Sequence, residues 1–360
     1  MNAEREVLLK LLRASVLGDT GFVIPENLDW DALIEESNRQ GVSVVASDGL
    51  QKLYDDGTYS DLGDKELRRK KARWFGKTME YEHRFAGQLA AATKMGKWLA
   101  STGIQTVILK GFTVSECYPI PAHRYSADFD CFLVKDGEHL EAYELGNQAM
   151  EKHEIAVSRG FYKNSSFKVG GLMVENHKFC VPFRGNEVLR RLEQLLQRMI
   201  LEGPLTVFGD TGLLEPPPLA SALFLTEHAY SHFLHEGLNL RHILDWALFR
   251  RRHTADVDWS AFDEYVDAFG FRRFYDAYAH LGEFILGERE TLTPLEQRMM
   301  DSVWAGLDLH ESVKGFVGKL RLAGNTLRAG WKYRAVSDIS MMRALWIQAK
   351  GVLFEHNPKL

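Results

Sequence analysis

Two aspartates one residue apart, Asp128 and Asp130, open the apolar run DFDCFLV at residues 128–134. Side chains alternate along a strand, so both carboxylates are expected on one face, with their Cα atoms about 6.6–6.8 Å apart. An unpaired carboxylate in an apolar core is costly, so the pair must be solvated or must hold a cation. Two such oxygen ligands suit Mg²⁺, which completes its shell with phosphates and water. For the pair taken alone, a solvated acidic strand start is the commoner alternative.

Two other segments carry residue types that fit the same chemistry. The run IQTVILK (104–110) predicts a buried strand that leads through Lys110 and Gly111 into a helix. Gly111 allows close backbone approach, a helix N-terminus offers free N–H groups to phosphate, and Lys110 adds a positive charge. In LMVENHKFCV (172–181), Glu175 and His177 share one face of a predicted strand. If that strand lies beside 128–134, Glu175 completes a carboxylate triad; taken singly, such residues are more often surface residues or parts of a tight turn.

In this order the motifs LKG, YP-x-P-x-x-R-x-x-x-DxD and V-E-x-H resemble the uncharacterised nucleotidyltransferase family of the polymerase-β-like superfamily. The matching residues are Lys110, Gly111, Tyr118, Pro119, Arg124, Asp128, Asp130, Glu175 and His177. The similarity extends from the N-terminal helices to about residue 250, through HAYSHF and LRHILDWALF. One departure is that Lys110–Gly111–Phe112 stands where the superfamily usually has Gly-Gly or Gly-Ser, so the phosphate contact falls to backbone N–H groups and to Lys110 or Arg124.

The resemblance implies transfer of a nucleoside monophosphate from an NTP, with Mg²⁺ or Mn²⁺, to an acceptor hydroxyl. It implies two metal ions, about 3.5–4 Å apart, held by the carboxylates of Asp128 and Asp130. Glu175 would complete the shell of the second ion and assist as general base, with His177 beside the site or in contact with substrate. The residues implied in nucleotide and phosphate binding are Lys110, Gly111, Arg124 and Ser126. The acceptor stays open between a small molecule, a protein side chain and an RNA end.

A rival site lies in HAYSHFLHEGLNLRHILD, residues 228–245. His228 and His232 are four residues apart on a predicted helix, His235 follows, and Asp245 comes later, which is a spacing that can bind Zn²⁺ or Fe in a His/Asp hydrolase. No HExxH motif is present, and histidines so spaced more often pack between helices or line a substrate cleft. Arg241 and Asp245 are expected to form an ion pair. A non-catalytic interaction scaffold is the third class of function.

The bulk composition describes an ordinary globular chain. It has 360 residues, 45% hydrophobic and 26% charged, with a net charge of −5, which argues against a surface that coats nucleic acid. Basic and aromatic residues in 327–351 fit either nucleic-acid binding or a half-buried helix. The three cysteines show no CxxC spacing, the segment MNAEREVLLKLLRAS carries charges among its apolar residues and so does not fit a signal peptide, and no apolar run is long enough for a membrane span. We therefore expect a soluble, cytoplasmic protein without membrane contact, whose oligomeric state is open.

The elements that must position these residues indicate an α+β fold, in which helices flank a small mixed β-sheet core. Helical periodicity covers 5–13, 28–54 and 65–102, and a further helix is expected over 136–153. Gly170–Gly171 predicts a hairpin turn, and a short strand pair is expected within 205–214. The predicted domains are an N-terminal helical region (1–103), a nucleotidyltransferase-like core (104–214) and a mostly helical C-terminal domain (215–360).

Overall fold

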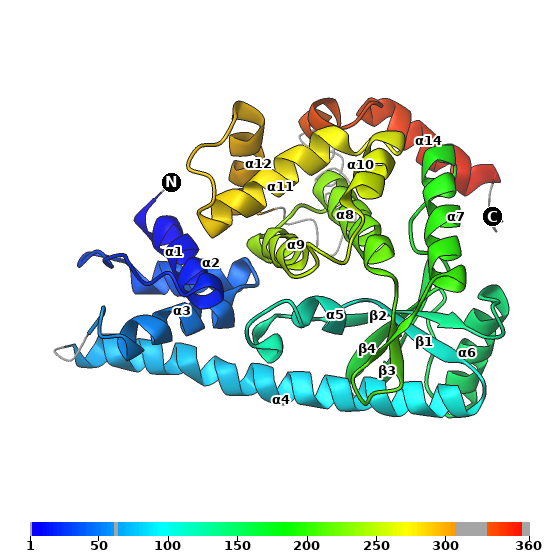
Figure 1. Cartoon of the computed structure of the whole chain (residues 1–360), viewed down its shortest axis with the longest axis horizontal. Helices are drawn as coiled ribbons and strands as arrows, with labels where there is room; N and C mark the ends of the chain where they lie inside the picture. The colour runs from blue at the N-terminus through cyan, green and yellow to red at the C-terminus, as the bar shows by residue number, and fades with distance from the viewer. Residues whose placement is uncertain (1, 61–63, 307–329, 355–360) are drawn as a thin grey trace, which may run out of the picture.

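The computed structural model describes residues 2–60, 64–306 and 330–354, and shows a mixed six-stranded sheet surrounded by helices (Figure 1). The strands are β1 (Gln105–Lys110), β2 (Asp128–Val134), β3 (Asn164–Val169), β4 (Leu172–His177), β5 (Thr206–Phe208) and β6 (Leu213–Glu215). Their order across the sheet is β3-β4-β2-β1-β6-β5. β2 runs antiparallel to β1 and parallel to β4, while β1 and β6 are parallel. The predicted α+β class and the predicted hairpin at Gly170–Gly171 are confirmed.

Each face of the sheet is covered by its own set of helices. The helices α4 (Lys65–Ser101) and α6 (Leu140–Lys152) pack on the face that carries Phe129, Cys131 and Leu133. The opposite face carries Phe132 and Val134 of β2 and packs towards α7 (Glu187–Glu202), α8 (Pro218–His235) and α9 (Leu240–Arg252). Because side chains alternate, the two aspartates of β2 lie on this second face. They therefore look towards the C-terminal helices rather than towards α4.

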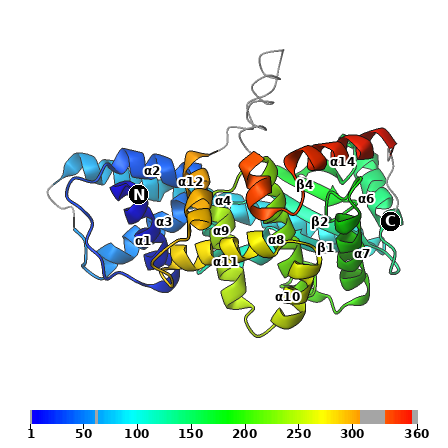
Figure 2. The same ribbon diagram turned by 90° about the horizontal axis from the view of Figure 1, so that it is seen from above.

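The N-terminal helices lie at one end of the molecule, and α4 runs from them to the far side of the sheet (Figures 1 and 2). They are α1 (Ala3–Leu17), α2 (Trp30–Arg39) and α3 (Ser43–Asp55). The helical segment predicted over 28–54 divides at Gly41, whose φ of 68° lies in the left-handed region. The helix predicted over 65–102 is confirmed as α4, with the Asp64 side chain capping its first turn.

Further helices complete the described part of the chain. They are the four-residue α5 (Phe112–Ser115), α10 (Trp259–Ala268), α11 (Arg272–Leu286), α12 (Pro294–Ala305), a helix over 330–336 and α14 (Met341–Phe354). In the helix over 330–336, Lys332 and Tyr333 face inward, and the Lys332 ammonium donates to the carbonyl of Phe233 at 2.7 Å. The part of 327–351 before residue 330 lies outside the described residues. No helix in the described ranges is both long and apolar enough to span a bilayer.

The start of α6 differs from the prediction. The helix expected from residue 136 begins at Leu140, because Asp136 and Gly137 form a tight turn with φ of 52° and 78°. Lys135 and Glu138 close this turn with two reciprocal backbone hydrogen bonds of 2.9 and 2.8 Å. An Asp-Gly pair favours this two-residue turn, which the helical periodicity after it had concealed.

One continuous apolar cluster contains residues from all three predicted domains, among them Leu8, Phe132 and Phe233. The boundary predicted at 103/104 falls between α4 and β1, and the one at 214/215 falls within β6. The domain division stays a prediction.

Candidate active site

The sheet register places three of the predicted site residues in one row. Lys110 on β1 is paired with Asp130 on β2, and Asp130 is paired with Glu175 on β4. A register shift between Ile108 and Lys110 accompanies the first pairing. The expectation that Glu175 lies on a strand beside the two aspartates is therefore met, and the row crosses the three middle strands of the sheet.

Asp130 is the most enclosed member of this row, with 3% of its surface exposed. Its Oδ1 atom lies 2.8 Å from Nε2 of His177, and its Oδ2 atom lies 4.0 Å from the ammonium of Lys110. Burial alone would favour the neutral acid, but the hydrogen bond with His177 and the charge of Lys110 hold the pKa of Asp130 well below its usual range. Within the described part of the chain, buried Oδ2 accepts no hydrogen bond. Asp130 is thus an ionised carboxylate with one oxygen left for another partner.

Asp130, Glu175 and His177 form the group best arranged to hold a metal ion. Their ligand atoms all lie within 4.8 Å of one another, and no other such group of His, Cys, Asp or Glu occurs among the described residues. His177 also approaches Glu175, with 3.6 Å between Nε2 and Oε2. Carboxylate oxygens suit Mg²⁺ and Mn²⁺, and an imidazole that binds a carboxylate orients it. The donor set and the unpartnered Oδ2 atom therefore fit a divalent cation of this kind.

Asp128 lies at the outer end of the same strand face and outside that three-residue group. It is half-buried, and burial together with the neighbouring charge of Asp130 raises the pKa of its carboxyl. Its backbone carbonyl accepts a hydrogen bond of 3.0 Å from the hydroxyl of Ser126. Ser126 thus stabilises the backbone at the start of β2. Of the two aspartate side chains, that of Asp128 is the more accessible.

Lys110 joins this site to the helices above the sheet. Its ammonium lies 2.7 Å from Nε2 of His228 on α8. Burial lowers the pKa of Lys110, an effect opposed by Asp130 and Asp128, and burial together with Lys110 holds the pKa of His228 well below its usual range. Since an ammonium has no acceptor, a neutral His228 accepts the hydrogen bond from Lys110.

Arg124, predicted to bind phosphate, lies in a buried ion pair. Its guanidinium donates to both carboxylate oxygens of Asp245, with Nε–Oδ1 at 2.6 Å and Nη2–Oδ2 at 2.7 Å. The Tyr118 hydroxyl donates to the same carboxylate at 2.7 Å. Arg124 also donates to the carbonyl of Gly111 at 3.3 Å, where φ is 107°. The motif residues Tyr118 and Arg124 therefore fix the glycine turn after β1 against α9.

The ion pair predicted between Arg241 and Asp245 is wrong, because Asp245 is bound by Arg124. Arg241 instead donates to the carbonyl of Tyr125 at 3.0 Å and lies 3.3 Å from Nε2 of His242. Its Nε atom is buried and has no hydrogen-bond partner in the described ranges. The charge of Arg241 reaches both Lys110 and Asp128, as its effect on their pKa values shows.

The histidines of 228–245 are brought together with one another, not with a carboxylate triad. The rings of His228 and His232 are 4.4 Å apart between centroids, and those of His232 and His242 are 5.0 Å apart. His232 is bound through Nδ1 to Glu236 at 2.9 Å. Among the described residues these side chains form no metal-ligand group, so the geometry does not supply the site that the His/Asp hydrolase alternative needs.

Lys163 and Glu227 lie near the site but carried no motif signal in the sequence, and Arg241 was predicted only as an ion-pair partner of Asp245. Lys163 precedes β3, and its charge acts on the pKa values of Asp130, His177 and His228. Glu227 neighbours His228 on α8 and is 3% exposed. The pairing of β3 and β4 in the sheet places Lys163 near the site, whereas the packing of α8 and α9 over the sheet places Glu227 and Arg241 there.

A row of carboxylates across central strands, with a lysine and a glycine turn beside it, is the kind of site that metal-assisted phosphoryl transfer uses. The family model described as uncharacterised nucleotidyltransferase matches residues 26–287, which is more than two thirds of the chain. The chain belongs to this family and is a transferase of the nucleotidyltransferase kind. No curated protein and no solved structure matches it significantly.

Proposed function

We propose that this enzyme transfers a nucleoside monophosphate from an NTP to an acceptor hydroxyl, with Mg²⁺ or Mn²⁺ bound by Asp128, Asp130 and Glu175. The observation that carries the proposal is the ionised, buried Asp130, whose Oδ2 atom has no hydrogen-bond partner beside Glu175 and Lys110. A buried carboxylate oxygen without a partner is costly unless a ligand compensates it. The three free cysteines of the structure agree with a reducing, cytoplasmic setting.

Each carboxylate has a distinct place in this mechanism. Asp130 and Glu175 hold the metal from adjacent strands, Asp128 contributes from the more exposed end of β2, and His177 orients Asp130 through their 2.8 Å hydrogen bond. When bound, one or two divalent ions neutralise the triphosphate and lower the pKa of the acceptor hydroxyl. Glu175, which keeps 33% of its side chain exposed, is the base that takes the proton from that hydroxyl.

The triphosphate binds at the β1 end of the row formed by Lys110, Asp130 and Glu175. Lys110 and the backbone of Gly111 face the leaving pyrophosphate, and the unpartnered Nε atom of Arg241 is a further donor for it. The acceptor oxygen forms its bond to the α-phosphorus while the bond from that phosphorus to the β-bridging oxygen breaks. Pyrophosphate leaves with the electron pair, and the lysine and arginine stabilise its charge. Arg124 acts through the glycine turn, which it holds in place.

Thermal unfolding with each NTP and Mg²⁺ tests the proposal. A ligand that binds only the folded protein stabilises it by about 2.7 kcal/mol at a hundredfold excess over Kd. We expect a Mg²⁺-dependent rise in Tm with at least one NTP, lost in the double variant Asp128→Asn/Asp130→Asn and kept in Asp136→Asn, which changes a carboxyl in the turn before α6. No rise with any NTP, with Mg²⁺ or Mn²⁺, would overturn the proposal.

A further inference from the structure

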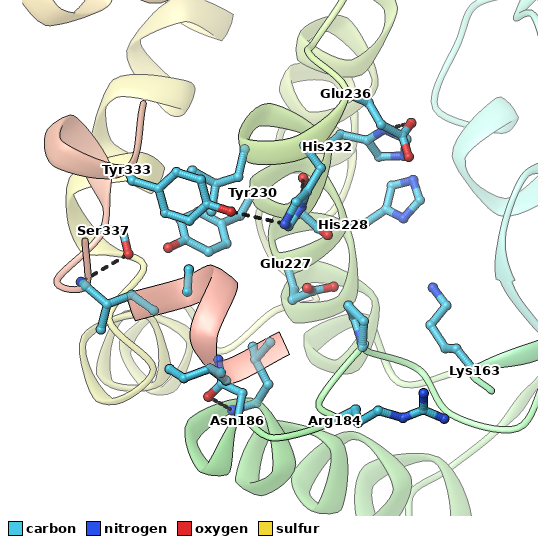
Figure 3. A pocket seen from close by; sticks show the side chains of 18 of the residues that line it. Lys163, Arg184, Asn186, Glu227, His228, Tyr230, His232, Glu236, Tyr333 and Ser337 are labelled. Atoms are coloured by element: carbon cyan, nitrogen blue, oxygen red, sulfur yellow. Dashed lines mark hydrogen bonds and ion pairs between the residues drawn. The ribbon is translucent and has the colours of Figure 1, made fainter. Parts of the chain in front are cut away.

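A cavity of about 500 Å³ lies beside the carboxylate row, between α8, the segments on either side of the β3–β4 hairpin, and the C-terminal helices (Figure 3). Phe161, Tyr162 and Lys163 line it from the segment before β3, and Pro182 and Arg184 line it from the segment after β4. In Figure 3, Lys163, His228 and His232 lie on one side, Tyr333 and Ser337 lie on the other, and Glu227 lies between them. This volume is in the range that holds a small organic molecule.

Glu227 lines this cavity as a buried carboxyl without a partner. It is 3% exposed, and within the described ranges no side chain or backbone group donates a hydrogen bond to it or pairs with it. The other buried glutamate nearby, Glu193, accepts backbone hydrogen bonds from Cys180 and Val181 at 3.0 and 2.7 Å. Because this carboxyl faces the cavity, a molecule bound there can supply the hydrogen-bond donor that the protein does not. Glu227 is therefore a receptor for a hydrogen-bond donor on a ligand.

Two residues connect the cavity to the carboxylate row. His228 lines the cavity and accepts the hydrogen bond of Lys110, which lies 4.0 Å from Asp130. Lys163 also lines it, and its charge acts on both Asp130 and Glu227. The lining residues His228 and Lys163 thus place the cavity near the metal-binding group, although Asp130, Glu175 and His177 do not themselves line it.

The place of the cavity relative to the strands gives it a role. The proposed phosphate contacts, Lys110 and Gly111, lie at the end of β1, whereas one wall of the cavity is made by the segments that precede β3 and follow β4, the strands on the other side of β2. In an in-line displacement the attacking and leaving oxygens stand on opposite sides of the phosphorus. With pyrophosphate leaving over β1, the acceptor must approach from the β4 side.

We propose that this cavity is the acceptor site, and that the acceptor is a small molecule with an apolar or aromatic body and a hydroxyl that donates to Glu227, separate from the hydroxyl that Glu175 deprotonates. This inference rests on the proposed function and names its acceptor class. Polar groups line several sides of the cavity, with Lys163 and His228 on the side towards the carboxylate row, and Leu189, Ile339 and Ala344 contribute apolar wall. A concave pocket of this volume, lined by both apolar and polar side chains, suits such a molecule better than a protein side chain or an RNA end.

Two matched probes test it: 2-phenylethanol and its methyl ether, which lacks only the donor hydrogen. Binding is measured by saturation-transfer NMR and titration on the wild type, on Glu227→Leu, and on Glu202→Gln, a control at the exposed C-terminal end of α7 that does not line the cavity. We expect the alcohol to bind the wild type at least tenfold more tightly than the ether, because a site built for a hydroxyl leaves its acceptor unpaired with the ether. Glu227→Leu should lose this preference, and Glu202→Gln should keep it.

Any of three results would overturn the inference. The wild type could bind the two probes equally, it could bind neither, or Glu227→Leu could keep the preference for the alcohol. Thermal unfolding of each variant with Mg²⁺ and NTP, run in parallel, separates the two proposals. A normal NTP-dependent rise in Tm together with no probe preference removes the acceptor site and leaves the proposed function standing. A probe preference without any NTP response removes the proposed function, and with it the acceptor role of the cavity.

Discussion

The ammonium of Lys110, at the end of central strand β1, lies 2.7 Å from Nε2 of His228 on α8 and 4.0 Å from Oδ2 of Asp130. This contact ties the helical layer to the carboxylate row at the point where the proposed reaction occurs. It also keeps the lysine within a buried polar cluster rather than in solvent, so its charge is little screened.

Lys110→Met should therefore abolish much of the activity without unfolding the protein. Methionine fills a similar volume, and a neutral His228 loses only an accepted hydrogen bond. We expect the rate of nucleotidyl transfer to fall by about 10²–10³, the usual effect of removing one preorganised donor. Steady-state kinetics with Mg²⁺·NTP check this, with Lys94→Met on exposed α4 as the control. A Lys110→Met enzyme with wild-type kinetics would exclude Lys110 from the phosphate site.

The Arg124–Asp245 pair should behave as a buried structural ion pair. Arg124→Met leaves the carboxylate of Asp245 with Tyr118 alone, and should lower the free energy of unfolding by about 3–5 kcal/mol. The double variant Arg124→Met/Asp245→Leu should recover much of this loss, because no unpaired charge then remains. Urea unfolding measures both, and Arg273→Met, which breaks the exposed pair with Asp338, should change stability by less than about 1 kcal/mol. If Arg124→Met lowered the free energy of unfolding only slightly, the Arg124–Asp245 pair would not be structural, and the wild-type guanidinium would be available to bind phosphate.

Glu227 should make stability depend on pH. Burial raises the pKa of Glu227 from 4.5 to about 7, against the opposite effect of Lys163. The unfolded chain releases this proton at lower pH than the folded one, so folding is disfavoured as the pH rises from about 4.5 to about 7. Glu227→Gln should therefore match the wild type near pH 4.5 and exceed its stability by up to about 3 kcal/mol above pH 7. Urea unfolding at a series of pH values measures the difference, and a pH-independent gap would contradict the assignment.

Two helical glycines should respond in opposite ways to alanine. A Cβ at Gly49 on α3 would lie 1.9 Å from the carbonyl oxygen of Leu11 on α1, so the two helices would have to separate. A Cβ at Gly76 on α4 would meet no atom within 4 Å. Gly49→Ala should destabilise the protein by about 1–3 kcal/mol or more, and Gly76→Ala should stabilise it by about 0.5–1 kcal/mol. Thermal and urea unfolding distinguish them, and a stabilised Gly49→Ala would show that α1 and α3 do not pack this closely.

The local part of this architecture could be predicted from residue patterns. The alternation in DFDCFLV placed Asp128 and Asp130 on one strand face, and the same rule placed Glu175 beside His177. The long periodicity of 65–102 predicted α4. The start of α6 was predicted four residues too early. The helical periodicity after residue 139 outweighed the turn signal of Asp136 and Gly137.

The partners of the site residues could not be predicted in the same way. Asp245 lies four residues from Arg241 on α9, yet it binds Arg124, which is 121 positions away along the chain. Helical spacing identifies residues on a common face, but it does not say which outside charge will approach that face. Lys163 and Glu227 carried no motif at all, because their importance depends on a cavity that segments before β3, after β4 and on α8 enclose together.

The sequence by itself determined the residue types, their strand faces and the resemblance to a nucleotidyltransferase family, since these depend on side-chain chemistry and on periods of two or 3.6 residues. The tertiary structure alone decided that Asp130 is ionised between His177 and Lys110, that Arg124 is committed to Asp245, and that Glu227 faces a cavity without a partner. These outcomes depend on distance and burial, which arise only when strands and helices far apart in the chain pack together.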